Sequence, residues 1–577
     1  MQITPVAEML ASRGLHSPHL HALIPNENNY SAFLLQPHGN IIASADGVHH
    51  ADRDLATTQF NGFLDDAVAF GADLAVAPEY SVPWQVLADS LRHGRVPAQG
   101  HLWALGCESI RYSELTALSA ELAPHAELIY EPLVPDDNRF VDPLAYVFVA
   151  DKATAGGNAR VVVLVQFKTS PMGGTQFEIA GLQRGTKIYI FGEGNSLRLV
   201  SIICSDALAF LDSHALAIYQ RSLVLHLQLN KHPRQEQYRL YRDLLLKYEG
   251  DETELLCLNW AKDVTECGEC WHNISGSAWY LRPDKFDHSD TQLTDNHRSG
   301  LYYTWFQSLR SNALFFNYEA ASYLLTASKV AHFGVPGSLS LRSGPKVSRR
   351  RVFDEGTRQW IDDSSAVDGF NTIIEECGGA TEDIRRVAEA SPINAERLLA
   401  LGAGAIGNTA DWHSVKKLDS FGIDKSEIIM RVTCCQDSHP TAKRFRVARL
   451  KRCARLRDVV ATGNLLPQAL ADLSDGFRFE WSPDSPHQNV VSQDNRRATA
   501  IYMGEEESTD QIEATAKRAA TFLHRSFSDP DESLEARQRL AIWYRNATNA
   551  IELFDRTRYL KYDDSRSASE FDIARAT

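Results

Sequence analysis

Between residue 30 and about residue 340, short apolar stretches alternate with helical or loop segments. Eight of these stretches have the length and composition of buried strands: 31–36, 72–79, 101–109, 144–150, 160–168, 197–204, 221–230 and 253–260. Apolar residues recur at helical spacing in 55–70 and 234–248. Alternating strands and helices indicate an α/β domain, and the long loops between some strands favour sheets that contain both hairpins and crossovers.

A change in composition at 334–351, where Gly, Pro, Ser and Arg are concentrated, indicates a linker or a domain boundary. Beyond it the pattern is mainly helical, and the helix expected at 391–401 has Ser391 as N-cap and Pro392 at its first position. Short stretches at 477–481 and 498–503 indicate strands. The sequence therefore predicts three segments: an N-terminal lead-in at 1–28, an α/β domain at 29–340, and a mainly helical (α+β) accessory domain at 346–577.

Composition and charge place the chain among ordinary globular proteins. Of its 577 residues, 44% are hydrophobic and 23% are charged, and the formal net charge is −15. This acidic balance disfavours a chain-wide affinity for nucleic acid or anionic membranes. The first residues lack the pattern of a secretory signal and no apolar run could span a membrane, so we expect a cytoplasmic protein whose nine cysteines are reduced.

Three of the predicted strands end in a reactive side chain. The stretch at 72–79 ends at Glu79, the one at 160–168 ends at Lys168, and the one at 197–204 ends at Cys204. Ligands of open α/β sheets bind at the carboxyl ends of strands, so these side chains could converge there. A carboxylate can take the thiol proton, the thiolate can attack an electrophilic carbon, and the ammonium and the Ser205 backbone N–H can stabilise an oxyanion.

Each of these residues, taken alone, also has an ordinary structural interpretation. Cysteine is often a buried core residue, Glu79 could be a loop carboxylate, and Lys168 could be a surface lysine. Their chain order, their strand-end positions and their spacing favour the catalytic interpretation.

At these residues the sequence resembles the nitrilase superfamily, the carbon–nitrogen hydrolases, which use a Glu–Lys–Cys triad in this order. The resemblance covers about residues 30–340 and includes AFLLQ, GADLAVAPEYS, LWALGCES, IICSD, LLCLNWA and SGSAWYLRP. The chain departs from the family at Ser205, where many members have a larger side chain, and in the long Glu79–Lys168 interval, where 131–143 looks like an insertion.

The resemblance implies a four-layer αββα nitrilase-type sandwich with the site at its strand ends. It also implies a second glutamate that positions the lysine, for which Glu178 fits best and Glu193 is the alternative. It places Asn259 and either Gly276 or Ser277 in the substrate pocket. It further implies a homo-oligomer, with a helix at 206–221 in the interface, and a reaction that needs neither a metal nor another cofactor.

The function expected from these residues is thiol-dependent hydrolysis of a non-peptide carbon–nitrogen bond, in an amide, carbamoyl group or nitrile, through a Cys204 acyl-enzyme. The region 346–577 lacks the SGGxDS-type loop of glutamine-dependent NAD synthetases. Nitrilase domains fused to other modules occur in antiviral defence systems, so a conditional effector in bacterial defence is one hypothesis. The alternative is a catalytically marginal scaffold whose C-terminal domain binds a protein or nucleic-acid partner.

Three further motifs admit more than one interpretation. Cys267 to Cys270, with His272 nearby, resembles half of a zinc site, although a loop near the pocket is favoured because no second CxxC pair exists. GAGAIG at 402–407 matches a dinucleotide fingerprint but follows a helical stretch, which favours a helix C-terminus. The segment from Lys443 to Arg457 holds eight basic residues and could be a solvated helix face or a contact for nucleic acid or protein.

Overall fold

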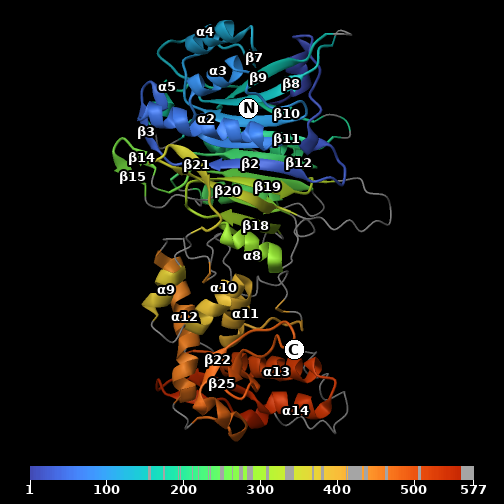
Figure 1. Cartoon of the computed structure of the whole chain (residues 1–577), viewed down its shortest axis with the longest axis vertical. Helices are drawn as coiled ribbons and strands as arrows, with labels where there is room; N and C mark the ends of the chain where they lie inside the picture. Colours follow the sequence, from blue (N-terminus) through green and yellow to red (C-terminus); the bar gives the residue numbers. More distant parts are fainter. Residues whose placement is uncertain are drawn as a thin grey trace. The chain divides into compact units, whose positions relative to one another are not determined.

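The chain forms two compact units (Figure 1). The first comprises Met1–Asp287 and Asp295–Ala366, and the second comprises His288–Thr294 and Val367–Thr577. This computed structural model describes residues 1–153, 157–172, 176–192, 194, 196–210, 212–218, 220–231, 233, 236–246, 252–262, 264–271, 277–281, 290–306, 311–331, 344–366, 370–377, 382–410, 412–413, 432–433, 440–461, 465–504 and 508–559.

A nine-stranded mixed sheet carries the segments of Glu79 and Lys168. Its strands are, in order across the sheet, β21 (Gln359–Asp362), β20 (Lys346–Asp354), β19 (Ala321–Ala327), β2 (Tyr30–Gln36), β5 (Leu74–Val82), β6 (Leu102–Cys107), β8 (Pro143–Ala150), β9 (Arg160–Phe167) and β7 (Glu127–Tyr130). β5 is parallel to β2 and β6, whereas β8 is antiparallel to β6 and β9. The sheet therefore contains both crossovers and hairpins, as the sequence pattern predicts.

An eight-stranded sheet carries the segment of Cys204. Its strands are, in order, β1 (Gln2–Pro5), β10 (Lys187–Phe191), β11 (Arg198–Ile203), β12 (Ser222–Leu227), β13 (Thr253–Leu258), β16 (Ala278–Leu281), β18 (Ser311–Phe316) and β17 (Leu301–Phe306). β11, β12 and β13 are parallel neighbours. All residues of β5, β12 and β13 are buried, which explains why these strands are continuous apolar runs and not alternating ones.

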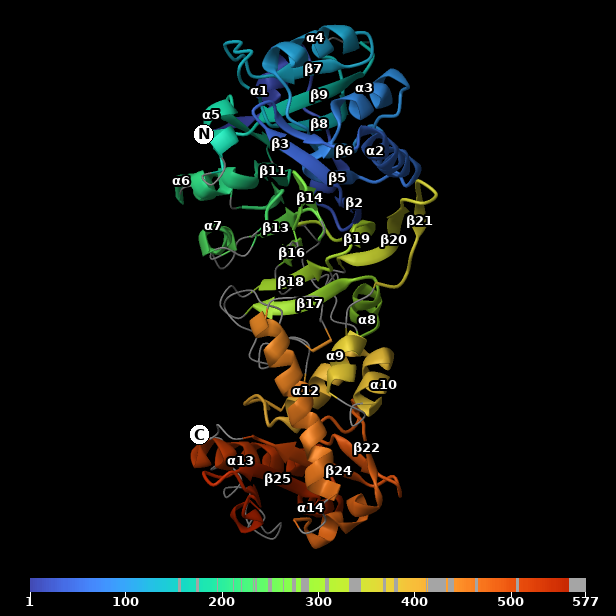
Figure 2. The same ribbon diagram turned by 90° about the vertical axis from the view of Figure 1, so that its left-hand side faces the viewer.

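The two large sheets pack face to face, with helices outside them. Gln166 of β9 donates its side-chain amide to the Ser201 carbonyl of β11 at 3.0 Å, and the rings of Tyr146 and Phe191 lie 5.0 Å apart. The helices α2 (Arg53–Ala69), α3 (Trp84–Arg92) and α4 (Tyr112–Leu122) cover the nine-stranded sheet, and α6 (Asp212–Ile218) and α7 (Glu236–Leu246) lie beside the other sheet (Figure 2). The predicted αββα layering of the first unit is confirmed.

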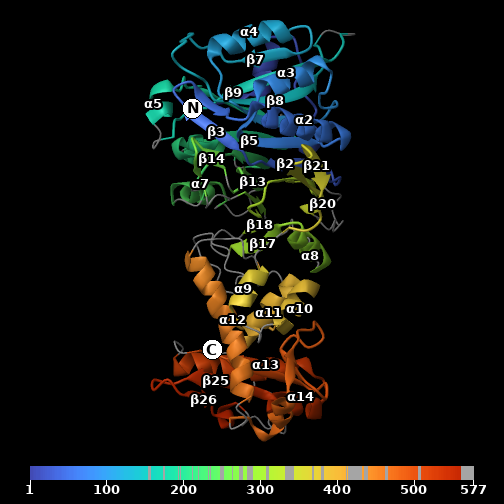
Figure 3. The same cartoon turned by 60° about the vertical axis from the view of Figure 1, so that its left-hand side comes forward.

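The second unit has its own hydrophobic core between helices and a five-stranded sheet (Figure 3). Its helices are α9 (Phe370–Glu376), α10 (Glu382–Ala390), α11 (Pro392–Gly402), α12 (Pro440–Ala461), α13 (Thr509–Ser526) and α14 (Pro530–Gln538). Its strands are β22 (Phe477–Phe479), β23 (Val490–Ser492), β24 (Arg497–Tyr502), β25 (Leu540–Arg545) and β26 (Ile551–Leu553). Ser391 caps α11 as expected, and Gly402 ends this helix, so GAGAIG covers a helix C-terminus. None of the described helices is long and apolar enough to cross a membrane.

The structure draws the boundaries of the first unit differently from the sequence. β20 and β21, expected in the C-terminal domain, extend the nine-stranded sheet through β19, and β1 of the expected lead-in pairs with β10. The sequence of β20, KVSRRRVFD, has no apolar run. Its Arg350 side chain is buried although it is charged, because it pairs with Glu319 and, at 2.7 Å, with Asp363. The last part of the Gly/Pro/Ser/Arg-rich stretch, from Lys346 on, therefore belongs to a strand of this sheet.

Candidate functional site

Glu79 lies at an irregularity within β5. Leu74 to Ala77 pair in regular register with β6, and pairing resumes only at Val82, so the backbone of Glu79 and Tyr80 departs from the ladder. Tyr80 has φ +58°, a left-handed conformation that is rare outside glycine. A Cβ on Gly106 of β6 would lie 2.1 Å from the Pro78 carbonyl oxygen, so this close approach requires glycine. The strand continues three residues beyond Glu79, whereas the sequence predicted that it ends there.

Lys168 follows β9 directly, as predicted, and its ammonium is buried among carboxylates. Its Nζ lies 2.9 Å from Glu79 Oε1, 3.0 Å from Glu178 Oε2 and 4.0 Å from Asp142 Oδ2. The Lys168 backbone N–H donates to the Asp142 carbonyl at 2.9 Å, and its own carbonyl accepts from the Gly185 N–H at 2.9 Å. Both the side chain and the backbone of Lys168 are thus held in place.

The buried charges of this cluster shift one another's pKa values. Burial lowers the pKa of Lys168, but nearby anions outweigh it and raise this pKa well above its ordinary value. In order of effect, these anions are Glu79, Glu178, Cys204 and Asp142. Burial raises the pKa of Glu79, and the Lys168 charge offsets this only in part. Lys168 is therefore a permanent cation, while Glu79 is a better proton acceptor than an exposed glutamate.

Cys204 follows β11 immediately and begins a 3-10 helix, η2 (Cys204–Ala209). Its side chain is fully buried and its φ is +39°, an uncommon backbone conformation for cysteine. Its carbonyl accepts a hydrogen bond from His226 Nε2 at 3.0 Å, and burial lowers the pKa of His226 to about 3, so this imidazole is neutral. The interface helix expected at 206–221 is instead η2 followed by the short helix α6.

Of the two candidate second glutamates, Glu178 lies at the lysine. It belongs to α5 (Gln176–Gly181), and its Oε2 accepts from the Met172 backbone N–H at 2.6 Å as well as contacting Lys168. Its other oxygen accepts from the Tyr80 hydroxyl at 3.3 Å. Glu193 lies outside the described residues.

The structure adds Tyr80 and Asp142 to the cluster, two residues that the sequence reasoning missed. The Tyr80 hydroxyl donates to Asp142 Oδ2 at 2.6 Å, and Ser109 Oγ donates to Asp142 Oδ1 at 2.6 Å. Burial raises the pKa of Asp142 to about 7. Tyr80 could have been noticed as the aromatic residue directly after Glu79, but Asp142 lies in the segment 131–143 that was interpreted as an insertion.

The turn after Cys204 is tied to the loop after Lys168. Asp206 Oδ1 accepts from the Thr169 N–H, the Thr169 hydroxyl and the Ser170 N–H, each at 2.8 Å. The Ser205 hydroxyl donates to the Ser170 carbonyl at 2.6 Å. The Ser205 backbone N–H belongs to the first turn of η2, where amides have no acceptor within the helix, as an oxyanion donor requires.

Asn259 and Ser277, predicted to line the substrate pocket, support the loops around Glu79. Asn259 Oδ1 accepts from the Asn230 N–H at 3.0 Å, and Asn259 Nδ2 donates to the Asn230 carbonyl at 2.9 Å. The Asn259 N–H donates to Ser277 Oγ at 2.9 Å. One residue before Asn230, the Leu229 N–H donates to Glu79 Oε2 at 3.0 Å, so this network holds the Glu79 carboxylate in place. Gly276 lies outside the described residues.

Two places in the first unit hold side chains of the types that bind metals. Cys267 and Cys270 are exposed and belong to a tight hairpin between β14 (Thr265–Glu266) and β15 (Glu269–Cys270), with Cys267 and Gly268 at positive φ. His272 lies outside the described residues. Hairpin turns of this kind need two residues at positive φ, which accounts for the Cys-Gly pair without a ligand role.

Among the described residues, His21, Asp73 and His101 have ligand atoms within 4.8 Å of one another. Asp73 Oδ2 accepts from the Ser31 N–H and hydroxyl, and Asp73 Oδ1 lies 3.2 Å from His21 Nδ1. The Lys329 ammonium donates to the His21 carbonyl and opposes a divalent cation beside it. These hydrogen bonds satisfy the carboxylate without a metal.

Comparisons with known proteins give matches only among solved structures. No protein-family model matches the chain, and no curated protein matches it. The chain is similar to an amidase from Nesterenkonia sp. at 15% identity, covering 44% of this chain and 84% of that one with a TM-score of 0.26. A CN-hydrolase superfamily protein from Xanthomonas campestris with an arsenic adduct in its active site matches at 10% identity, 44% and 82% coverage, and a TM-score of 0.27.

A glutamine-dependent NAD+ synthetase from Acinetobacter baumannii in complex with ADP matches at 12% identity, with a TM-score of 0.29. The match covers 67% of this chain and 57% of the synthetase, so the chain spans little more than half of that protein's length. The first unit is an αββα sandwich, the layering that the sequence resemblance implies, and the second unit is unassigned.

Proposed function

We propose that the first unit hydrolyses a non-peptide carbon–nitrogen bond through an acyl-enzyme on Cys204. The observation that carries this proposal is the buried Lys168 ammonium, held 2.9 Å from Glu79 and 3.0 Å from Glu178 and close enough to Cys204 for the thiolate to raise its pKa. A buried charge cluster of this kind is costly to build, because each ion must be removed from water. Buried ionisable groups with shifted pKa values are typical of functional sites, so the cost of this cluster is expected where its groups react with a ligand.

The reaction on an amide has two halves. Glu79 takes the Cys204 proton, and the thiolate attacks the carbonyl carbon while Lys168 and the Ser205 N–H stabilise the oxyanion. The tetrahedral intermediate collapses, the C–N bond breaks, and protonated Glu79 returns its proton to the leaving ammonia or amine. Glu79 then removes a proton from water, hydroxide attacks the thioester carbon, and the C–S bond breaks. The carboxylic acid is released, and Glu79 returns its proton to the Cys204 thiolate.

In this mechanism Glu178, Tyr80 and Asp142 do not touch the reacting atoms. Glu178 pairs with the Lys168 ammonium at 3.0 Å, and Tyr80 links Glu178 with Asp142. They are positioning residues. Replacement of Glu178 by Gln should therefore lower kcat by roughly 10 to 100 fold, with a smaller change in KM. The Lys168 ammonium would lose a contact that orients it, whereas the Lys168 backbone would keep its position.

The direct test is ammonia release from a panel of small amides, carbamoyl compounds and nitriles. We expect turnover of at least one compound by the natural chain and complete loss in Cys204→Ala. Cys107→Ala is the matched control, since Cys107 is an equally buried thiol of the same unit that lies in β6. Turnover that persists in Cys204→Ala contradicts the proposal.

At the level of the whole chain, we propose a homo-oligomeric cytoplasmic enzyme, and a conditional effector in bacterial defence is one setting for it. The alternative function is a scaffold that binds a protein or nucleic-acid partner through the second unit. If no compound of the panel is turned over and Cys204 does not react with electrophiles, the scaffold is favoured.

A further inference from the structure

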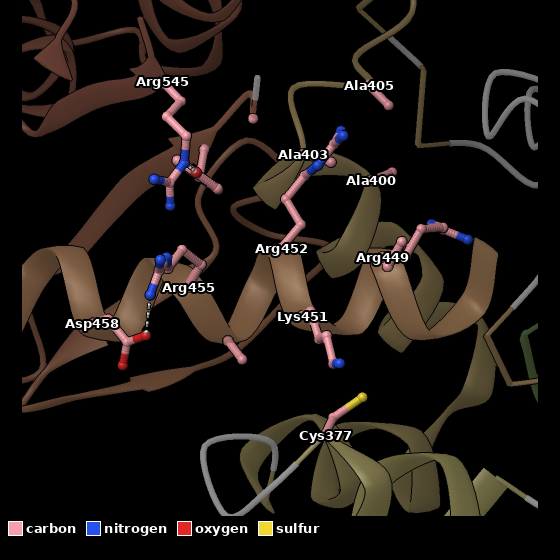
Figure 4. A pocket seen from close by; sticks show the side chains of 14 residues that line it. Cys377, Ala400, Ala403, Ala405, Arg449, Lys451, Arg452, Arg455, Asp458 and Arg545 are labelled. Atoms are coloured by element: carbon pink, nitrogen blue, oxygen red, sulfur yellow. Dashed lines mark hydrogen bonds and ion pairs between the residues drawn. The ribbon is translucent and has the colours of Figure 1, made fainter. Parts of the chain in front are cut away.

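The second unit contains a groove that the proposed hydrolase chemistry does not use. It has a volume of about 770 Å³, within the range of small-molecule sites, and lies between α11, α12 and the ends of β24 and β25 (Figure 4). Many of the side chains that line the groove are small, so they leave its volume unfilled. These small residues are Ala400, Ala403, Ala405, Ala448, Ala454 and Gly504.

The charged side chains of the groove are mostly positive. Five cations line it, against one carboxylate, Asp458; the cations are Arg449, Lys451, Arg452, Arg455 and Arg545. Arg449 pairs with the buried Glu396 at 2.9 Å, and Arg455 pairs with Asp458 at 3.2 Å. Within the described part of the chain, Lys451 and Arg452 have no ion-pair partner. Glu505 to Glu507 follow Gly504 but lie outside the described residues, so this charge count covers the described lining only.

Three of the cations come from two facing walls of the groove, whereas Lys451 points to the other side of α12, toward Cys377 (Figure 4). Ala448, Arg452 and Arg455 recur at helical spacing on one face of α12. Arg545 of β25 approaches the same side of α12 from the facing wall (Figure 4). Its Nε donates to the Tyr502 hydroxyl at 3.2 Å, and its Nη1 donates to the Asn549 carbonyl at 2.9 Å, so the guanidinium is fixed before any ligand binds.

The position of the groove in the fold independently indicates a ligand site. β24 and β25 are parallel neighbours, and their last residues, Tyr502 and Arg545, both line the groove. Ligands of open α/β sheets bind beyond the carboxyl ends of such strands. Gly504, just past β24, has φ +87°, and a Cβ there would lie 3.2 Å from an Arg452 guanidinium nitrogen. The lack of a side chain at Gly504 therefore leaves room for the Arg452 guanidinium beside the end of β24.

We propose that this groove binds a small ligand with two or more phosphate groups, such as a nucleoside diphosphate or triphosphate. Guanidinium groups bind phosphate oxygens in pairs, and cations on two facing walls can surround a compact polyanion. A long nucleic acid would instead need a continuous basic surface, whereas several other cations of α12 are paired. Lys443 pairs with Glu376 at 2.8 Å, and Arg457 pairs with Asp383 at 2.6 Å.

Isothermal titration calorimetry on the full chain tests this proposal, with ATP, ADP, inorganic triphosphate, adenosine and a short single-stranded RNA as probes. We expect ATP and triphosphate to bind and adenosine not to bind. Arg452→Ala should weaken ATP binding by at least roughly tenfold, and Arg452→Lys by less, because lysine keeps the charge but not the paired hydrogen bonds. Binding of ATP without triphosphate also supports the site and shows that the nucleoside contributes.

Arg444→Ala is the matched control, because Arg444 is an exposed arginine of α12 that does not line the groove. ATP binding should be unchanged in this variant. Three results would overturn the proposal: binding of RNA without ATP or triphosphate, equal losses in Arg444→Ala and Arg452→Ala, or no binding of any phosphate compound. A circular dichroism spectrum of each variant separates loss of binding from loss of folding.

Discussion

Lys168 supports the whole buried cluster, because three neighbouring carboxylates interact with its charge. Removing one partner from a buried ion pair typically costs about 3–5 kcal/mol, since the remaining charges are left uncompensated. The cluster is stable only as a set, with Glu79 and Glu178 in direct contact with the ammonium. Burial raises the pKa of Glu79, and the Lys168 charge beside it offsets this only in part, which suits a group that must accept and return a proton.

Asp206 gives a pH-dependent prediction. Burial raises the pKa of Asp206 in the folded protein from 3.8 to about 6, even though three hydrogen bonds to Oδ1 oppose the shift. Between these two values Asp206 binds more protons in the folded chain than in the unfolded chain, so its contribution to the free energy of unfolding falls as the pH rises from about 4 to about 6. The contribution of this carboxyl is up to about 3 kcal/mol.

Asp206→Asn should remove this contribution, because an amide does not titrate. Urea denaturation at a series of pH values, followed by tryptophan fluorescence, measures it. We expect the variant to lose less stability than the natural protein across this pH interval. Identical slopes for the two proteins would show that the buried carboxyl does not hold a proton there.

Among the strands, the β5–β6 pair fixes where Glu79 stands. The irregularity between Ala77 and Val82 is possible because Gly106 of β6 lets the Pro78 carbonyl approach. We predict that Gly106→Ala destabilises the first unit by about 1–3 kcal/mol and lowers hydrolase activity further, because Glu79 is displaced from Lys168. Denaturant unfolding and turnover measure the two effects.

Gly39→Ala is a suitable comparison for Gly106→Ala. A Cβ on Gly39 would meet only the Trp260 ring at 3.6 Å and the His50 ring at 3.8 Å, which are ordinary contacts. We expect it to change stability by less than about 1 kcal/mol. Equal effects of the two substitutions would mean that the close approach at Pro78 does not constrain β5.

The strands that carry the site could be predicted because they are buried on both faces and therefore appear as continuous apolar runs. Their reactive ends, Lys168 and Cys204, followed from this pattern, and Glu178 followed from the family resemblance. Asp142 could not be predicted, since its role depends on a hydrogen bond to Tyr80, which lies 62 residues earlier in the chain. β20 was missed because buried ion pairs replace apolar residues there.

For the chain as a whole, exposed leucines near the turn that begins at Cys204 provide a test of assembly. Leu208 of η2, Leu216 of α6 and Leu240 of α7 are 47%, 55% and 58% exposed. Exposed apolar groups that gather in one region mark association surfaces. We predict that the natural chain is a dimer or larger in solution and that Leu216→Asp shifts it toward the monomer, as measured by light scattering coupled to size-exclusion chromatography.

Val134→Asp is the control for this experiment, because Val134 is 84% exposed but belongs to the segment 131–143, away from α6 in the sequence. Its mass in solution should equal that of the natural chain. A natural chain that is strictly monomeric would contradict the proposed oligomer, and an unchanged mass in Leu216→Asp would place the interface elsewhere.

The central claim, that Cys204 is an activated nucleophile, is tested most directly by the rates at which buried thiols react. Cys107 and Cys453 are as buried as Cys204, and burial raises the pKa of both, that of Cys453 to about 12. The measurement is time-resolved iodoacetamide labelling of the folded chain at neutral pH, with each cysteine quantified by peptide mass spectrometry. The account predicts that Cys204 reacts at least roughly tenfold faster than Cys107 and Cys453, and that Glu79→Gln removes this excess. A Cys204 that reacts as slowly as the other two would contradict it.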